Sequence, residues 1–134
     1  MIVTENPPHV RRIDTDRPDA WAFEITGHIS AADVENMYGL LEAAFELHES
    51  IDLLVRIDHY EGFDWSAAFR ESTLVGKSRV LSRLRRYAVI GGPGWVSATM
   101  ALVKPFMSVE MKHFEAEEEA HAWAWIDARP AEPD

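Results

Sequence analysis

The stretch that decides the fold is residues 51–65, IDLLVRIDHYEGFDW. It opens with apolar and β-branched residues, and Leu53–Val55 are apolar without a break. Such a run is typical of a strand that is buried on both faces, as in the middle of a parallel sheet. Three elements are predicted from it: a strand over Ile51–Ile57, an exit loop over Asp58–Asp64 and a helix from Trp65 to about Leu81. A central strand that feeds a helix indicates an α/β domain.

Further elements are predicted on both sides of this stretch. His9–Thr15 and Ala20–Thr26 are predicted to form an antiparallel hairpin, because Asp16–Asp19 between them has turn chemistry. The alternation of Trp21, Phe23 and Ile25 with smaller or polar residues is expected when one strand face is buried. The remaining predictions are a helix over Ala31–His48, a strand over Tyr87–Ile90, a helix over Trp95–Val103, a strand over Val109–Phe114 and a helix over Glu115–Ala128. This order predicts a mixed five-stranded sheet with four helices and a parallel core.

Composition narrows the class of protein. The 134 residues fit a single domain, 1–134 with a core over about 9–128, and 47% apolar residues against 27% charged residues are ordinary for a soluble protein. Without cysteine, disulfide and thiol chemistry are excluded. No signal peptide and no membrane span are seen, so a cytoplasmic location is expected. The net charge of −10 argues against a nucleic-acid partner.

The charge is unevenly distributed along the chain. Residues 72–109 contain no acidic residue and carry a charge of +6, so the remainder carries −10 − 6 = −16. One interpretation is a local basic face on an acidic body. The other is a set of solvated charges at helix ends and in loops, which is the more common case.

Several short matches, in order along the chain, resemble one known family. They are ITGHIS at 25–30, IDLLVRIDHYEGFDW at 51–65, RRYAVIGG at 85–92 followed by Trp95, LVKPF at 102–106 and EEEAHAWAWI at 117–126. Over about residues 9–128 this set resembles the SpoIIAA-like family of small bacterial proteins, related in fold to STAS domains and to lipid-binding CRAL-TRIO domains. The resemblance implies an α/β fold with a mixed five-stranded sheet in a βα superhelix. It also implies homodimers and an association with ligands or membranes.

The resemblance raises the question of a phosphorylation switch. The more distantly related anti-sigma factor antagonists carry a phosphorylatable serine in an Asp-Ser-Ser-Gly-like turn after the central strand. That motif is absent from residues 58–66, although Ser66 lies near the corresponding position. A helix N-terminus would favour a phosphoryl group there, whereas Glu61 and Asp64 would oppose it. Ser66 is therefore kept only as a minor alternative.

Catalytic and metal sites find little support in the sequence. Asp58, His59, Glu61 and Asp64 cluster after the central strand, where α/β sheets often bind ligands, but their spacing matches no metal pattern. Gly91–Gly94 lacks the residues of a phosphate-binding loop and is interpreted as a sharp turn that lets Trp95 pack. No histidine has a second histidine four residues later, and no nucleophile motif is present. We expect no metal, no cofactor and no enzymatic activity.

The most informative anomaly is apolar. Residues 87–103 contain no charge, and the predicted helix within them is apolar nearly all round. Such a helix is either buried or presented to something apolar, and a chain of this size has difficulty enclosing it fully. The sequence does not decide between core, dimer interface and ligand site. The residues predicted to form an apolar ligand site are Trp65, Phe69, Trp95, Met100 and Phe106.

Three functional hypotheses follow. The first is a non-enzymatic binding module for an apolar or lipid-like ligand or a membrane surface, with the basic residues of 77–86 meeting anionic head groups. Such a protein would be cytoplasmic or peripheral to the membrane. The second is a STAS-like regulatory module that binds another protein. The third is an enzyme that uses the Asp58–Asp64 loop, and a homodimer is compatible with all three.

Overall fold

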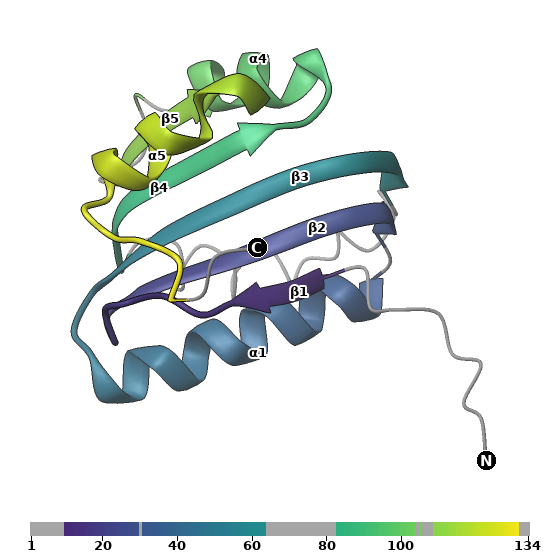
Figure 1. Ribbon diagram of the computed structural model, residues 1–134. Coiled ribbons are helices and arrows are strands. Elements are labelled where there is room, and N and C mark those ends of the chain that lie inside the picture. Colours follow the sequence, from purple (N-terminus) through teal and green to yellow (C-terminus); the bar gives the residue numbers. More distant parts are fainter. Residues whose placement is uncertain (1–9, 30, 64–82, 104, 106–108, 132–134) are drawn as a thin grey trace.

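The computed structural model describes residues 10–29, 31–63, 83–103, 105 and 109–131. These form one sheet in the order β1-β2-β3-β4-β5 (Figure 1). The strands are β1 Val10–Ile13, β2 Ala20–Ile29, β3 Ile51–Phe63, β4 Leu84–Gly91 and β5 Glu110–Phe114. The helices are α1 Ala31–Leu47, α4 Gly94–Val103, the 3-10 helix η2 Ala116–Glu118 and α5 Glu119–Trp125. The predicted α/β class and the mixed five-stranded sheet are confirmed.

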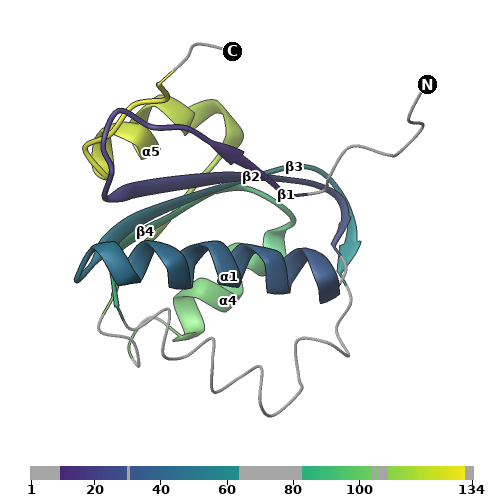
Figure 2. The same cartoon turned by 90° about the horizontal axis from the view of Figure 1, so that it is seen from below.

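The sheet is built around β3. β1 and β2 pair antiparallel, whereas the β2–β3, β3–β4 and β4–β5 pairs are all parallel. Ile51–Val55 are all buried, as their unbroken apolar pattern predicts for a central strand. Helices cover both faces, with α1 and α4 on one side and α5 on the other (Figure 2).

Each face of the sheet has its own hydrophobic core. The first core lies under α1 and α4 and contains Phe23, Leu41, Phe45, Leu53, Val55, Val89, Met100 and Met111. The second lies under α5 and contains Ala22, Leu54, Ala88, Ile90, Phe114, Trp123 and Ile126. β2 was predicted to bury only one face, which is wrong. Ala20 and Ala22 are 2% and 0% exposed, because small side chains on that face let Trp123 and Ile126 approach the sheet.

Several predicted element boundaries are wrong. Asp58–Phe63 is not a loop, since β3 continues to Phe63 alongside β2, which itself runs beyond Thr26 to Ile29. The last helix is shorter than predicted, because a 3-10 turn precedes it. There Glu115 and Glu118 form a reciprocal capping box, in which the Glu115 backbone N–H donates to Glu118 Oε1 at 2.9 Å. The predicted helix from Trp65 to about Leu81 lies outside the described residues.

Among the described residues, none of the helices is both long and apolar enough to cross a membrane.

Candidate functional site

The predicted ligand site is only partly described. Trp65, Phe69 and Phe106 lie outside the described residues, as does Ser66, and of Trp95 only the backbone in the first turn of α4 is described. Met100 is 9% exposed and belongs to the first core. The residues that can be placed therefore do not outline a pocket, and the predicted site stays a prediction.

The apolar helix α4 divides into a buried and an exposed side. Met100 is buried and Val96 packs half-buried against the first core. On the other side Ser97, Ala98, Ala101 and Leu102 are exposed, and Leu102 keeps 74% of its surface accessible. We call these four residues the outer face of α4. Part of the uncharged segment is thus core and part is a free surface, which the sequence pattern alone left undecided.

The described arginines that were predicted to bind lipid head groups instead form hydrogen bonds within the fold. Arg83 donates to the carbonyls of Phe45 and His48 at 3.0 and 3.2 Å, and so caps the end of α1. Arg85 and Arg86 also point to partners within the fold: Asp52 and Asp19 for Arg85, and Glu110 and the carbonyl of Trp125 for Arg86. The described part of the basic segment is therefore neither a basic patch nor a set of free solvated charges. Lys77 and Arg79 lie outside the described residues.

Asp52 is the centre of these contacts. Its carboxylate is 2% exposed and lies where β2, β3 and β4 begin. Arg17 and Arg85 both donate to it, at 3.0 and 2.9 Å, and the backbone N–H of Arg86 donates at 3.2 Å. We call Arg17, Asp19, Asp52 and Arg85 the Asp52 cluster.

Charge pairing shapes the protonation of the Asp52 cluster. A hydrogen bond from Arg17, followed by one from Arg85, holds the pKa of Asp19 below its ordinary value against the opposing effect of burial. The hydrogen bond to Asp52 is the main cause that raises the pKa of Arg85. Asp19 and Arg85 are thus held in their charged forms, and neither is poised to transfer a proton near neutral pH.

A second charge cluster lies at the start of α5. Arg56 donates to Glu24 and Glu119, each at 2.7 Å, and Trp123 donates its indole N–H to Glu119 at 3.1 Å. Burial would lower the pKa of Arg56, but the hydrogen bonds to the two carboxylates outweigh it and the pKa is raised. This arrangement fixes α5 on the sheet rather than presenting a charge to a substrate.

The stretch predicted as a catalytic loop lies in a strand. Asp58 and His59 are 3.6 Å apart, and 54% and 82% of their side chains are exposed. His59 adopts a positive φ of 49° at the point where the β2–β3 register shifts. Within the described residues no group of three or more histidine, aspartate or glutamate side chains could hold a metal ion. The described part of this stretch thus offers a surface pair and no enclosed site, while Asp64 lies outside it.

The glycine turn before α4 serves packing. Gly91 has a φ of +73°, and a Cβ atom there would lie 2.7 Å from the backbone oxygen of Ile57. A Cβ on Gly92 would lie 3.3 Å from Val96. The turn therefore brings Val96 against β3. The predicted packing of Trp95 stays a prediction, because its side chain lies outside the described part of the chain. His113 Nε2 makes a hydrogen bond of 2.8 Å with the carbonyl oxygen of Gly91.

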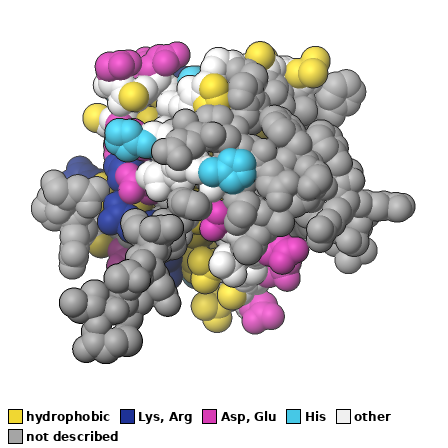
Figure 3. All heavy atoms as spheres, turned by 90° about the vertical axis from the view of Figure 1, so that its right-hand side faces the viewer, with side chains coloured by type: hydrophobic (Ala, Val, Ile, Leu, Met, Phe, Trp, Pro, Cys, Tyr) yellow, Lys and Arg dark blue, Asp and Glu magenta, His cyan; other side chains and the backbone are white. Residues whose placement is uncertain are grey.

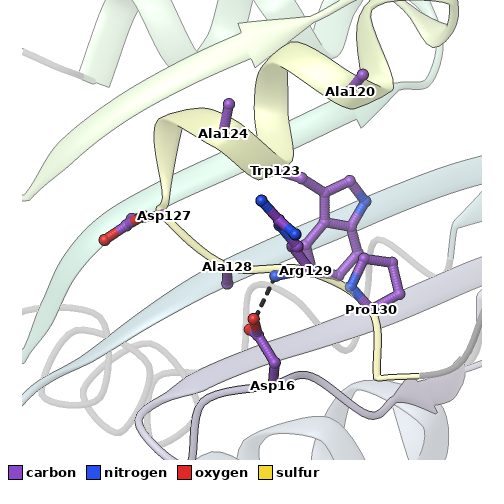
Figure 4. A pocket seen from close by; sticks show the side chains of 8 residues that line it. All are labelled: Asp16, Ala120, Trp123, Ala124, Asp127, Ala128, Arg129 and Pro130. Atoms are coloured by element: carbon purple, nitrogen blue, oxygen red, sulfur yellow. Dashed lines mark hydrogen bonds between the residues drawn. The ribbon is translucent and has the colours of Figure 1, made fainter.

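A surface pocket of about 640 Å³ lies beside α5 (Figure 4). Its walls include Ala120, Trp123 and Ala124, and the backbone N–H of Arg129 donates to Asp16 at 2.9 Å across one end. Met100, the one predicted ligand residue whose side chain is described, does not line it. No sequence pattern predicts this pocket. Its walls are Asp16 and residues 120–130, which lie at opposite ends of the chain and meet only in the folded structure.

Comparison with known proteins points to one family. The model of the SpoIIAA-like family matches residues 20–127. An uncharacterised protein of the DUF3478 family from Shewanella loihica PV-4, with a SpoIIAA-like fold, is similar in structure, with a TM-score of 0.68 and 25% identity. The match covers 92% of this chain and 98% of that one. No curated protein matches the chain significantly.

Proposed function

This chain belongs to the SpoIIAA-like family, and from that premise we propose that it is a non-enzymatic protein–protein interaction module that docks its partner through the outer face of α4. The observation that carries the proposal is the 74% exposure of Leu102 on a helix without any charged residue. An exposed large apolar side chain beside Ala98 and Ala101 loses unfavourable contact with water when a partner covers it.

Charge favours a protein partner over an anionic membrane. The chain carries −10 overall, so an anionic surface repels it. Peripheral membrane binding needs basic residues beside the apolar ones, and α4 has no basic residue in its last turn. The arginines nearest in sequence, Arg83–Arg86, contact the fold itself. Binding of a lipid-like ligand therefore stays a prediction from the sequence. We prefer the second hypothesis, a regulatory module that binds another protein.

Crosslinking from α4 tests the proposal. A photoreactive benzoylphenylalanine replaces Ala101 on the outer face of α4, and in a matched chain it replaces Ala124, which is exposed on α5. We expect a defined crosslinked product from position 101 and none from position 124. If a second copy of the chain is the partner, as the homodimer prediction holds, the product forms with purified protein and contains this chain alone.

Leu102→Asp provides the decisive variant. Because Leu102 is exposed, the substitution should change the free energy of unfolding by no more than about 0.5 kcal/mol. It should weaken the crosslinked complex at least about tenfold, since a buried apolar contact becomes a buried charge. Equal crosslinking with and without Leu102→Asp would refute the proposal. Leu102-dependent binding to anionic vesicles would refute it in favour of a membrane surface.

A further inference from the structure

A second candidate surface is the outward side of α1. The inward side of this helix packs into the first core through Leu41 and Phe45. On the outward side Leu40, Ala43 and Leu47 are all exposed, and Leu47 keeps 80% of its surface accessible. Residues three, four or seven positions apart lie on the same side of a helix, so these three side chains form a continuous line. We call them the leucine stripe of α1.

A row of carboxylates runs along one flank of the leucine stripe. Glu35, Glu42 and Glu46 are exposed and follow one another at helical spacing. α1 contains no lysine or arginine, and none of the three glutamates forms an ion pair with a described residue. Figure 3 shows hydrophobic side chains beside acidic side chains along the lower edge of the molecule, where α1 lies. We call the three glutamates the acidic row of α1.

The acidic row is unfavourable for the chain on its own. Glu42 and Glu46 are four residues apart, where like charges on a helix surface repel one another. Glu46 also lies in the last turn of α1, where the helix macrodipole favours a cation. Arg83 caps this end of the helix, but its guanidinium group donates to the carbonyls of Phe45 and His48 rather than to either glutamate. A cationic partner would therefore relieve a repulsion that the described part of the fold leaves in place.

Shape and charge together select the occupant of this surface. Leu40 and Leu47 are separated by two helical turns, about 10 Å along the axis, which suits the packing of a second helix against α1. The complement is an amphipathic helix with apolar residues along its centre and lysine or arginine on the flank that meets the acidic row. An anionic membrane is repelled by the same carboxylates. A second copy of the chain fits less well, because an antiparallel pair of α1 helices would bring one acidic row against the other.

We propose that the leucine stripe and the acidic row of α1 form a docking face for a basic amphipathic helix of a partner protein. Burial of the leucine stripe supplies the affinity, and the acidic row selects the charge of the partner helix. The face shares no residue with the outer face of α4, so the two proposals stand or fail separately.

Titration with a defined helical peptide tests this proposal on the full chain. The probe is a blocked peptide of about 18 residues with leucine at heptad positions a and d, lysine at e and g, and alanine elsewhere. In a chain with labelled leucine and alanine methyl groups, we expect it to shift the resonances of Leu40, Ala43 and Leu47 and to leave that of Leu102 unchanged. The same peptide with glutamate in place of lysine should bind at least about tenfold more weakly.

Two matched pairs of variants locate the docking face. Leu47→Ser should weaken binding of the lysine peptide at least about fivefold, whereas Leu102→Ser on α4 should alter it less than about twofold. Both leucines are exposed, so neither change should disturb the fold. Glu46→Lys should weaken binding about tenfold. Glu117→Lys makes the same charge change at an exposed position of η2 and should alter binding less than about twofold.

Several outcomes would overturn the proposal. They are equal losses within either matched pair, equal binding of the glutamate peptide, methyl shifts at Leu102 in place of Leu47, and no binding at about 1 mM lysine peptide. Self-association that depends on Leu47 would overturn it in favour of a second copy. Binding to anionic vesicles that depends on Leu47 would overturn it in favour of a membrane surface.

Discussion

Asp52 shows how a single residue organises one end of the molecule. Among the described residues it is the one charged side chain that is fully buried, and its partners come from the β1–β2 turn and from β4. Burying a carboxylate is costly unless its oxygens are fully hydrogen-bonded, and here four hydrogen bonds from three residues satisfy them. The guanidinium groups of Arg17 and Arg85 are partly exposed, which keeps their own loss of hydration small. The Asp52 cluster is therefore a structural tie whose charges are balanced.

Tyr87 supplies a prediction about alkaline pH. Burial in the first core raises the pKa of its phenol to about 12. The unfolded chain ionises near the ordinary value of about 10, so the folded state binds the proton more tightly. The stabilisation is complete below about pH 10 and is lost as the pH rises toward about 12. We expect Tyr87→Phe to remove about 1 kcal/mol of the fall in unfolding free energy between about pH 9 and about pH 11.

Chemical denaturation at the two pH values measures this difference. Tyr38 gives a matched variant, because burial also raises the pKa of its phenol. Tyr38→Phe should reduce the alkaline loss as well, and the double variant should reduce it further. If Tyr87→Phe unfolds with the same pH dependence as the parent chain, the phenol is not protected by the fold.

At the scale of the element, the end of β4 depends on one glycine. Gly91 has φ +73°, and an added Cβ would meet the Ile57 oxygen at 2.7 Å. Gly91→Ala combines an unfavourable positive φ with a steric clash against the Ile57 oxygen. The free energy of unfolding should therefore fall by about 2 kcal/mol or more. Gly39→Ala in α1 is the matched control, since nothing lies within 4 Å of the added methyl group. It should stabilise the chain by about 0.5–1 kcal/mol. Urea unfolding measures both, and a neutral Gly91→Ala would show that β4 ends for another reason.

The same end of the sheet shows where sequence patterns stop being informative. Leu53–Val55 predicted a central strand because burial on both faces leaves a local apolar signature. Asp58–Phe63 left none, since Asp58, His59, Glu61 and Gly62 break any run of apolar residues and the stretch is a strand through its pairing with β2. The exposed side of α4 was also ambiguous, because Leu102 and Met100 look alike in sequence and only the burial of Met100 in the first core separates them.

At the scale of the whole molecule, folding brings the described arginines of the basic segment into contact with acidic side chains and carbonyl groups from other parts of the chain. The segment 72–109 carries +6 and the remainder −16, yet the described arginines of this segment contact acidic side chains or carbonyls far away in the chain. Residues such as Arg85 and Asp52 lie 33 positions apart, so no local pattern could pair them. The acidic surplus that remains is what an anionic membrane or nucleic acid would meet.

Arg17 and the backbone around it join the two ends of the described chain through hydrogen bonds. Arg17 lies in the β1–β2 turn, donates to Asp19 and Asp52, and also donates to the carbonyls of Ile126 and Asp127 at 2.8 and 3.0 Å. Next to it, Asp16 donates its backbone N–H to the Arg129 carbonyl at 3.0 Å, and Ala131 donates to that of Asp14 at 2.7 Å. The C-terminal segment is thus held in two ways, by the Arg17 guanidinium group and by the backbone pairing of residues 14–16 with 129–131.

Arg17→Lys tests this closure, because lysine keeps the charge but cannot donate in all these directions at once. We expect the free energy of unfolding to fall by about 1–3 kcal/mol. Amide exchange at Asp16 and Ala131 should accelerate more than exchange in β3, because closure is lost locally before the sheet opens. Arg11→Lys is the control, since Arg11 is 57% exposed and donates to Glu24 alone among its described partners. It should change unfolding by about 0.5 kcal/mol or less. Unaltered exchange at Ala131 in Arg17→Lys would mean that the backbone pairing of residues 14–16 with 129–131 suffices without the guanidinium group.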